Sequence, residues 1–199
     1  MPKGRLEAFS DGVLAVIITI MVLEIHSPAG PDLGALGASW PAVAEYALSF
    51  VYVGIYWNNH HHLLHASRRV GGRAMWANLH LLFWLSLVPL ATGWIGKYPF
   101  ASLPTAVYGG LLFLAGVAFV IFAQAMAALD PDNAALREAV TGSAAKGIAS
   151  QLLYLAAVGL AFVRPWIAQV IYAGIAALWV IPDPRIERRL AAESAPTVD

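Results

Sequence analysis

Six long apolar stretches, separated by short polar segments, run along this chain. They cover residues 6–25, 41–64, 74–95, 103–129, 146–163 and 165–181. Each is as long, or nearly as long, as the ~20 residues that a helix needs to cross a bilayer. Turn-forming residues such as Gly71-Gly72 lie between them, and Pro89 predicts a kink in the third stretch. The pattern predicts an all-α integral membrane protein with six transmembrane helices per subunit.

The composition supports this class of protein. Hydrophobic residues make up 59% of the 199 positions and charged residues 12%, whereas a soluble domain carries about 25% charged residues. The chain has no cysteine, which excludes disulfides and thiolate metal sites. The loops are too short for a separate soluble domain. We therefore expect one transmembrane domain over residues 1–185 and a cytoplasmic tail over residues 186–199.

The positive charges are distributed unevenly between the two sides that six spans would create. Of the 12 Lys and Arg residues, ten fall on the side of the N-terminus, and only Lys97 and Arg164 fall on the other. Short cytoplasmic loops carry the excess of Lys and Arg in membrane proteins. The split predicts that both termini are cytoplasmic, and it agrees with an even number of spans.

The first apolar stretch has an unusual arrangement of acids. Within it, the twelve positions from Gly12 to Leu23 carry no charge, Ser10 and Asp11 precede them, and Glu24 follows them. Twelve helical residues rise only about 18 Å, but the hydrocarbon core of a bilayer is about 30 Å thick. Both ends cannot lie in open water, so at least one acid is held at membrane depth. An ionisable group in that position is a functional-site hypothesis.

Helical periodicity divides this stretch into faces. At 100° per residue, one narrow stripe contains Gly12, Val16, Thr19 and Leu23, with Ile20 beside it. Periodicity alone favours packing against other helices, because small and hydroxyl residues often serve that purpose in membranes. Asp11 projects towards a flank of the stripe, where we expect it to be a buried anchor bonded to the third helix.

Two further polar groups interrupt the apolar pattern. His80 and Trp84 share a face of the third helix, and Ser10 or Asp11 lies at a suitable depth to bond His80. His60, His61, His62 and His65 form a cluster at the end of the second stretch. His61 and His65 have a spacing that metal ligands use, but no nearby acid completes a site. A polar helix end at the cytoplasmic interface is the favoured interpretation, and a metal site or membrane enzyme is an alternative.

The first helix resembles that of the prokaryotic relatives of transmembrane protein 175, which are potassium-permeable channels. The resemblance rests on three motifs in the first half of the chain: Arg5-x-x-x-Phe9-Ser10-Asp11-Gly12, Tyr56-Trp57-x-x-His60-His61, and Asn78-Leu-His80-Leu-Leu-Phe-x-Leu-Ser86-Leu-x-Pro89. It implies a homotetramer in which the first helix of each subunit lines a central pore. The Thr-Val-Gly-Tyr-Gly filter of ordinary potassium channels is absent from both the family and this chain.

The resemblance also implies roles for individual residues. It assigns the apolar constriction to Val16, where the family usually has Ile or Leu, and a threonine layer to Thr19. Ile20 and Leu23 become further pore-facing positions. Arg5, Ser10, Asp11, His80 and Trp84 match a polar network behind the pore, which is structural rather than catalytic.

The function expected from this resemblance is a potassium-permeable, modestly selective cation channel in a prokaryotic plasma membrane. The permeant ion K⁺ passes near Thr19, and no cofactor, bound metal or nucleic acid is expected. The expected partners are other copies of the chain, membrane lipid and monovalent cations. The alternative is a proton leak or proton-coupled transporter that uses Asp11 and His80.

Overall fold

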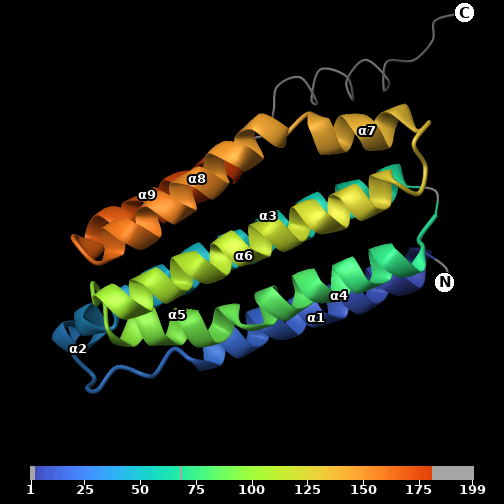
Figure 1. Ribbon diagram of the computed structural model, residues 1–199. Coiled ribbons are helices and arrows are strands. Elements are labelled where there is room, and N and C mark those ends of the chain that lie inside the picture. The colour runs from blue at the N-terminus through green and yellow to red at the C-terminus, as the bar shows by residue number, and fades with distance from the viewer. Residues whose placement is uncertain (1–2, 68, 181–199) are drawn as a thin grey trace, which may run out of the picture.

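The computed structural model describes residues 3–67 and 69–180, and all regular structure in these ranges is helical. The helices run roughly parallel to one long axis as a bundle (Figure 1). Their bounds are α1 (Lys3–Leu23), α2 (Leu33–Ala38), α3 (Trp40–Ala66), α4 (Gly72–Ser86), α5 (Val88–Lys97), α6 (Ser102–Ala127), α7 (Ala134–Thr141), α8 (Ala144–Ala161) and α9 (Pro165–Val180). The all-α prediction is confirmed.

The six predicted stretches correspond to α1, α3, the α4–α5 pair, α6, α8 and α9. The third stretch is divided at Leu87, and Pro89 stands in the first turn of α5. Proline has no N–H for the helical bond and its ring clashes with the preceding turn, so the kink predicted at Pro89 is confirmed.

Two short helices lie in the segments between the predicted apolar stretches. The Asp32 carboxylate accepts a 2.8 Å hydrogen bond from the amide of Ala35 at the start of α2. The Asn133 side chain accepts a 3.1 Å bond from the amide of Leu136 at the start of α7. Asp and Asn side chains satisfy the free amides of a first helical turn, so Asp32 and Asn133 begin these two helices.

Four segments of the described chain are long and apolar enough to cross a membrane: Lys3–Leu23, Gly72–Lys97, Ser102–Ala127 and Ala134–Ala161. The apolar helix α9 is shorter. Helix α3 has 27 residues but is less apolar, because it carries Glu45, three tyrosines and the polar run 58–62. These segments make the chain an integral membrane protein.

The position of α1 follows from its packing. One face of α1 is buried against α3, α4 and α5, through residues such as Leu14, Ile17 and Met21. Helices α8 and α9 pack against the opposite side of the bundle, on α6 and α3. Helix α1 therefore lies at an edge of the bundle and is covered on one side only.

The ends of the bundle separate the charged loops. The start of α1, the end of α3, the start of α4 and α7 lie together at one end, and α2 and the α8–α9 connection lie at the other (Figure 1). Arg69, Arg73 and Arg137 therefore share an end, whereas Lys97 and Arg164 belong to the opposite end. The alternation of loops along the sequence assigned these charges to the same two sides.

Candidate pore-lining helix and polar network

Helix α1 has an uncovered face that coincides with the stripe found from periodicity. Gly12, Val16, Thr19, Ile20 and Leu23 are all exposed, with 54% of Val16 and 78% of Leu23 accessible. The buried positions Leu6, Ser10, Leu14, Ile17 and Met21 form the other face. The stripe therefore takes no part in the packing of its own chain.

The only hydroxyl group in the stripe belongs to Thr19. Its Oγ1 donates a 2.8 Å hydrogen bond to the backbone carbonyl of Val16, one turn earlier in α1. This bond uses the hydroxyl proton, so the lone pairs of the oxygen point away from the helix backbone and can accept. Thr19 thus presents an oxygen acceptor in an otherwise apolar stripe.

Asp11 has a different partner from the one expected. Its carboxylate accepts a 3.1 Å hydrogen bond from Nε1 of Trp57 on α3, and the Asp11 side chain is exposed within the chain. The prediction that Asp11 is a buried anchor bonded to the third apolar stretch, which forms α4 and α5, was wrong. The reason is that α3 also packs along α1, and its tryptophan reaches the flank on which Asp11 projects.

A fully buried hydrogen-bond chain joins α1, α4 and α3. Nδ2 of Asn78 donates to Ser10 Oγ at 2.9 Å, and Ser10 Oγ donates to the carbonyl of Leu6 at 2.9 Å. The other end of the Asn78 amide, Oδ1, lies 2.7 Å from His60 Nε2. Because Ser10 uses its proton on Leu6, Asn78 must donate to it and must accept from a protonated His60 Nε2. We call Ser10, Asn78 and His60 the clasp.

His60 extends the clasp to a fourth helix. Its ring stacks on Phe122 of α6, with centroids 5.1 Å apart and an angle of 14° between the planes. Both rings are almost completely buried. Sequence reasoning missed the roles of Asn78 and His60, since His60 stands in a run of polar residues that is typical of a helix end. The signal available was Asn78, an amide in an apolar helix.

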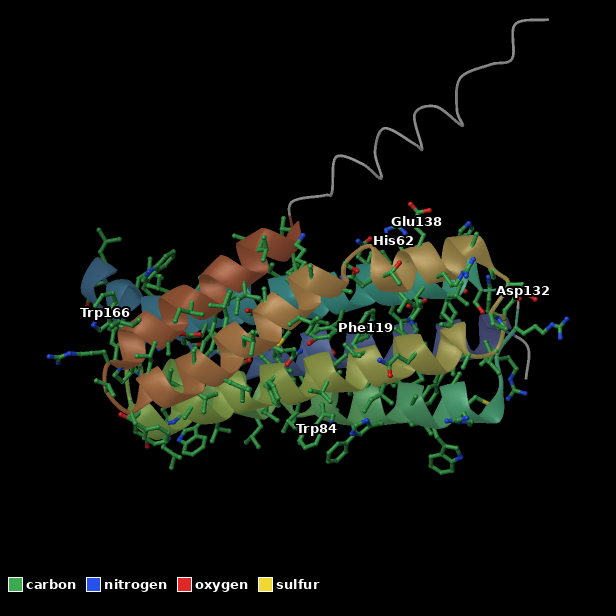
Figure 2. All side chains as sticks on the ribbon, turned by 45° about the horizontal axis from the view of Figure 1, so that its top comes forward. His62, Trp84, Phe119, Asp132, Glu138 and Trp166 are labelled. Atoms are coloured by element: carbon green, nitrogen blue, oxygen red, sulfur yellow. The ribbon has the colours of Figure 1, made fainter. Side chains whose placement is uncertain are left out.

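His80 and Trp84 form a pair within α4. Trp84 Nε1 donates a 2.9 Å hydrogen bond to His80 Nε2, and neither Ser10 nor Asp11 is a partner of His80. Figure 2 shows Trp84 at the outer side of the bundle. Arg5 is also exposed, and it forms no side-chain hydrogen bond or ion pair within the described residues. Within one chain the residues of the expected network therefore lie at four separate places: Ser10 in the clasp, Asp11 on Trp57, His80 with Trp84, and Arg5.

The histidine cluster at the end of α3 contacts Glu7 at the start of α1. His61 Nδ1 lies 3.2 Å from the carboxylate of Glu7, and the rings of His61 and His65 stack with centroids 6.0 Å apart. Within residues 3–67 and 69–180, no three His, Cys, Asp or Glu side chains are grouped as metal ligands. The cluster joins the end of α3 to the start of α1, and its geometry gives the metal-site alternative no support.

A groove runs beside the stripe, between α1 and α3. Its volume is about 420 Å³ and its walls are almost entirely apolar. The lining residues are Asp11, Leu14, Ala15, Ile18, Phe50, Gly54, Trp57 and Asn58. The groove and the stripe together give α1 a continuous apolar surface that this chain does not cover.

Three comparisons relate this geometry to known proteins. Residues 5–89 match the family described as the endosomal/lysosomal potassium channel TMEM175. A potassium channel of Chryseobacterium sp. (strain P1-3) is 48% identical over 190 residues, which cover 96% of this chain and 98% of that protein. The endosomal/lysosomal proton channel TMEM175 of Bos taurus is 33% identical over 144 residues, covering 63% of this chain but 30% of its own.

A solved structure agrees with the fold. The crystal structure of a lysosomal potassium-selective channel TMEM175 homolog from Chamaesiphon minutus superposes with a TM-score of 0.79 and 27% identity. The match covers 89% of this chain and 96% of that one. Sequence and fold thus agree over nearly the whole length, and the chain belongs to the TMEM175 family, whose members are ion channels and not enzymes.

Proposed function

We propose that this protein is a potassium-permeable, modestly selective cation channel. Four copies would assemble around an axis, with the stripe of each α1 (Val16, Thr19, Ile20 and Leu23) facing the pore. The observation that carries the proposal is the exposed stripe on α1, which interrupts its apolar side chains with a single oxygen acceptor. The relatives named potassium channels support the permeant ion.

The need for several copies follows from the fold. One chain contributes one stripe, and a pore wall requires stripes on all sides of the axis. The apolar groove between α1 and α3 offers each copy a surface on which a neighbour can pack. Gly12 has open space beyond its Cα, and a small residue at this position lets neighbouring helices approach closely.

The proposed constriction acts by excluding water. A ring of Val16 side chains, followed by rings of Ile20 and Leu23, offers a cation no replacement for its hydration shell, and such a constriction gates by dewetting. The Thr19 oxygens lie beside the Val16 ring and replace part of the lost water. Because there is no rigid cage of carbonyl groups, the preference for K⁺ over Na⁺ should be modest.

The clasp and the Asp11–Trp57 bond would hold α1 in register behind the pore. The clasp joins α1 to α4 and α3 from the buried side, opposite the stripe. It therefore fixes which face of α1 is turned outward. We propose structural roles of the same kind for Arg5, His80 and Trp84, although they do not contact Asp11 within one chain.

The membrane arrangement is part of the proposal. Helices α1, α3, α4–α5, α6, α7–α8 and α9 would make six spans within a single domain over residues 1–185, in a prokaryotic plasma membrane. The end with the excess of Lys and Arg would be cytoplasmic, and it carries the N-terminus. The cytoplasmic tail expected over residues 186–199 lies outside the described residues.

A proton leak or proton-coupled transporter is the second candidate, because the bovine relative is named a proton channel. Asp11 and His80 were the residues expected to carry protons. Asp11 contacts Trp57 and His80 contacts Trp84, so the two side chains are not linked to each other in the described chain. This separation favours the cation channel.

Reconstitution into liposomes with a K⁺ flux assay tests the proposal. The wild type should conduct K⁺, and Val16→Asn should increase the flux because a polar ring holds water in the constriction. Val22→Asn is the matched control, since Val22 is also exposed on α1 but lies on another face. Absence of flux under every gradient would overturn the channel. Equal effects of the two substitutions would overturn the pore assignment.

A further inference from the structure

A buried carboxyl group lies in the other half of the bundle, away from the stripe and the clasp. Glu45 on α3 is only 9% exposed, and its Oε2 atom has neither solvent contact nor a hydrogen-bond partner. An ionised carboxylate without partners is much more costly to bury than the neutral acid. Neither the packing of α1 nor the proposed pore accounts for an acid at this position.

Tyrosines and hydroxyl groups surround Glu45. Ser49 stands one turn further along α3 on the same buried face. The Ser49 hydroxyl lies 2.9 Å from that of Tyr108 on α6, and the Tyr108 ring contacts that of Tyr172 on α9, so the buried face that carries Glu45 is turned towards these tyrosines. On α3 itself, the other titratable groups near this level are Tyr46 and Tyr52.

The remaining helices supply no countercharge. Helix α5 presents Thr92, and its cation, Lys97, lies exposed at the C-terminal end over the Tyr98 ring. Helix α8 contributes Tyr154, whose ring contacts Tyr52. The acid at the end of α1, Glu24, is exposed and lies over Gly93 of α5. Within the described ranges no Lys, Arg or His forms an ion pair with Glu45.

A chain of hydroxyl groups leads from this site to the pore helix. The Tyr108 hydroxyl lies 2.9 Å from Ser49 Oγ, and Ser49 Oγ lies 2.7 Å from Thr92 Oγ1. Thr92 Oγ1 is also 2.8 Å from the carbonyl of Val88 and 4.0 Å from the sulfur of Met21. Met21 is completely buried on α1, on the face opposite the stripe.

This chain has two possible directions. Each hydroxyl has one proton, so Thr92 donates either to Ser49 or, on its other side, to Val88 or the sulfur of Met21. In the first arrangement Tyr108 donates to Ser49 and Ser49 donates to Thr92. In the second, Thr92 donates to Ser49 and Ser49 donates to Tyr108, so Tyr108 is free to donate towards a negative charge. A negative charge on Glu45 would favour the second arrangement, in which Thr92 has no proton left for the sulfur of Met21.

We propose that Glu45 is a proton-binding site, and that its protonation state is transmitted through Tyr108, Ser49 and Thr92 to Met21 on the pore helix. The site itself needs only the buried carboxyl and the hydroxyl chain. Its effect on conduction rests on the proposed function, because it requires that α1 lines the pore.

A proton fits this site better than a metal cation. The hydroxyl oxygens of Ser49 and Thr92 already bond each other, and a proton needs no cavity. One groove lies beside α1, and another of about 440 Å³ lies between α3 and α9. Glu45 lines neither of them.

Infrared difference spectroscopy of the purified protein tests the proton site without any need for conduction. Exchange between acidic and alkaline buffer should reveal the carbonyl band of a protonated carboxyl in a non-aqueous environment. Glu45→Gln should remove this band, whereas Asp132→Asn, which changes an exposed acid at the other end of the bundle, should leave it. A wild-type spectrum without the band, or an unchanged band in Glu45→Gln, would overturn the site.

Potassium flux in liposomes, with equal pH on both sides, tests the transmission. Wild-type K⁺ flux should change by about fivefold or more over the pH range in which the infrared carboxyl band appears and disappears. A fivefold change is at the lower end of allosteric coupling. Glu45→Gln should remain at the acidic wild-type value at every pH. Thr92→Val should lose the pH dependence but keep the band, and Thr92→Ser should retain both.

The two proposals can fail separately. The same pH profile in the wild type and in Glu45→Gln or Thr92→Val would overturn the transmission but leave the channel standing. A protein without any flux would overturn the proposed channel and the transmission with it, and the infrared band would still decide the proton site.

Discussion

Asn78 on α4 donates a 2.9 Å hydrogen bond to the hydroxyl of Ser10 on α1, and both side chains are completely buried. The same amide accepts from His60, so one side chain ties three helices together. The bond lies on the face of α1 opposite Val16 and Thr19. It therefore turns the stripe away from the chain's own core, and the orientation of the proposed pore depends on it.

Asn78→Leu should destabilise the fold. The substitution keeps the approximate volume but leaves the N–H of His60 without an acceptor in an apolar environment. An unpaired buried polar group costs about 1–3 kcal/mol. Thermal unfolding in detergent measures the loss, and Gln124→Leu on the exposed side of α6 is the control. Equal unfolding temperatures for the two variants would show that the clasp adds no stability.

Thr19→Val should lower K⁺ flux by about tenfold, equivalent to about 1.4 kcal/mol in the barrier. Valine has nearly the shape of threonine but lacks the oxygen that accepts from a hydrated cation. Thr19→Ser keeps this oxygen and should retain most of the flux and of the preference for K⁺ over Na⁺. Concentration gradients of the two ions across liposomes measure both properties. Wild-type behaviour in Thr19→Val would exclude the threonine from the ion path.

Val16→Leu should reduce the flux at rest, and Val16→Ala should increase it. The side chain at the proposed constriction determines how much water the closed pore holds, and valine is smaller than the Ile or Leu that the resemblance predicts at this position. The resting K⁺ leak of liposomes, compared with that of Val22→Leu, measures the effect. An unchanged leak across this size series would place the constriction at another residue.

The hydrophobic pattern was sufficient to predict the long helices, because membrane burial requires long apolar segments. Pro89 was equally informative, since the loss of one N–H breaks a helix in any environment. Asp32 and Asn133 were ambiguous, because the same side chain serves a turn or a helical first turn. Only the bounds of α2 and α7 settled which structure each residue begins.

The partners of polar side chains were harder to predict than the helices. Periodicity placed Asp11 on the flank of the stripe, but it could not reveal which neighbouring helix would meet that flank. The answer, Trp57, depends on the rotation of α3 about its own axis. His60 was hidden by its polar neighbours, and its burial follows from the position of α6 against the end of α3. Tertiary packing decides such contacts.

Gly109→Ala should be strongly destabilising. The hydroxyl of Tyr172 lies against the Cα of Gly109 and donates a 3.1 Å hydrogen bond to the carbonyl of Thr105, so an added methyl group overlaps it. Overpacking of this kind costs about 1–3 kcal/mol. Gly110→Ala is the matched control, because nothing lies within 4 Å of the position of its methyl group. Similar unfolding temperatures for the two variants would contradict the close packing of α6 on α9.

Asp11→Asn separates the two candidate functions. Asparagine keeps an oxygen that accepts from Trp57, but it cannot carry a proton. A structural Asp11 therefore predicts a loss of stability of about 0.5–1.5 kcal/mol, from a weaker hydrogen bond, and K⁺ flux per assembled protein close to wild type. Trp57→Phe removes the donor and should produce a similar loss of stability. If Asp11→Asn abolishes proton flux while the unfolding temperature and the assembly state are unchanged, Asp11 lies on a proton path. That result would favour the proton transporter over the cation channel.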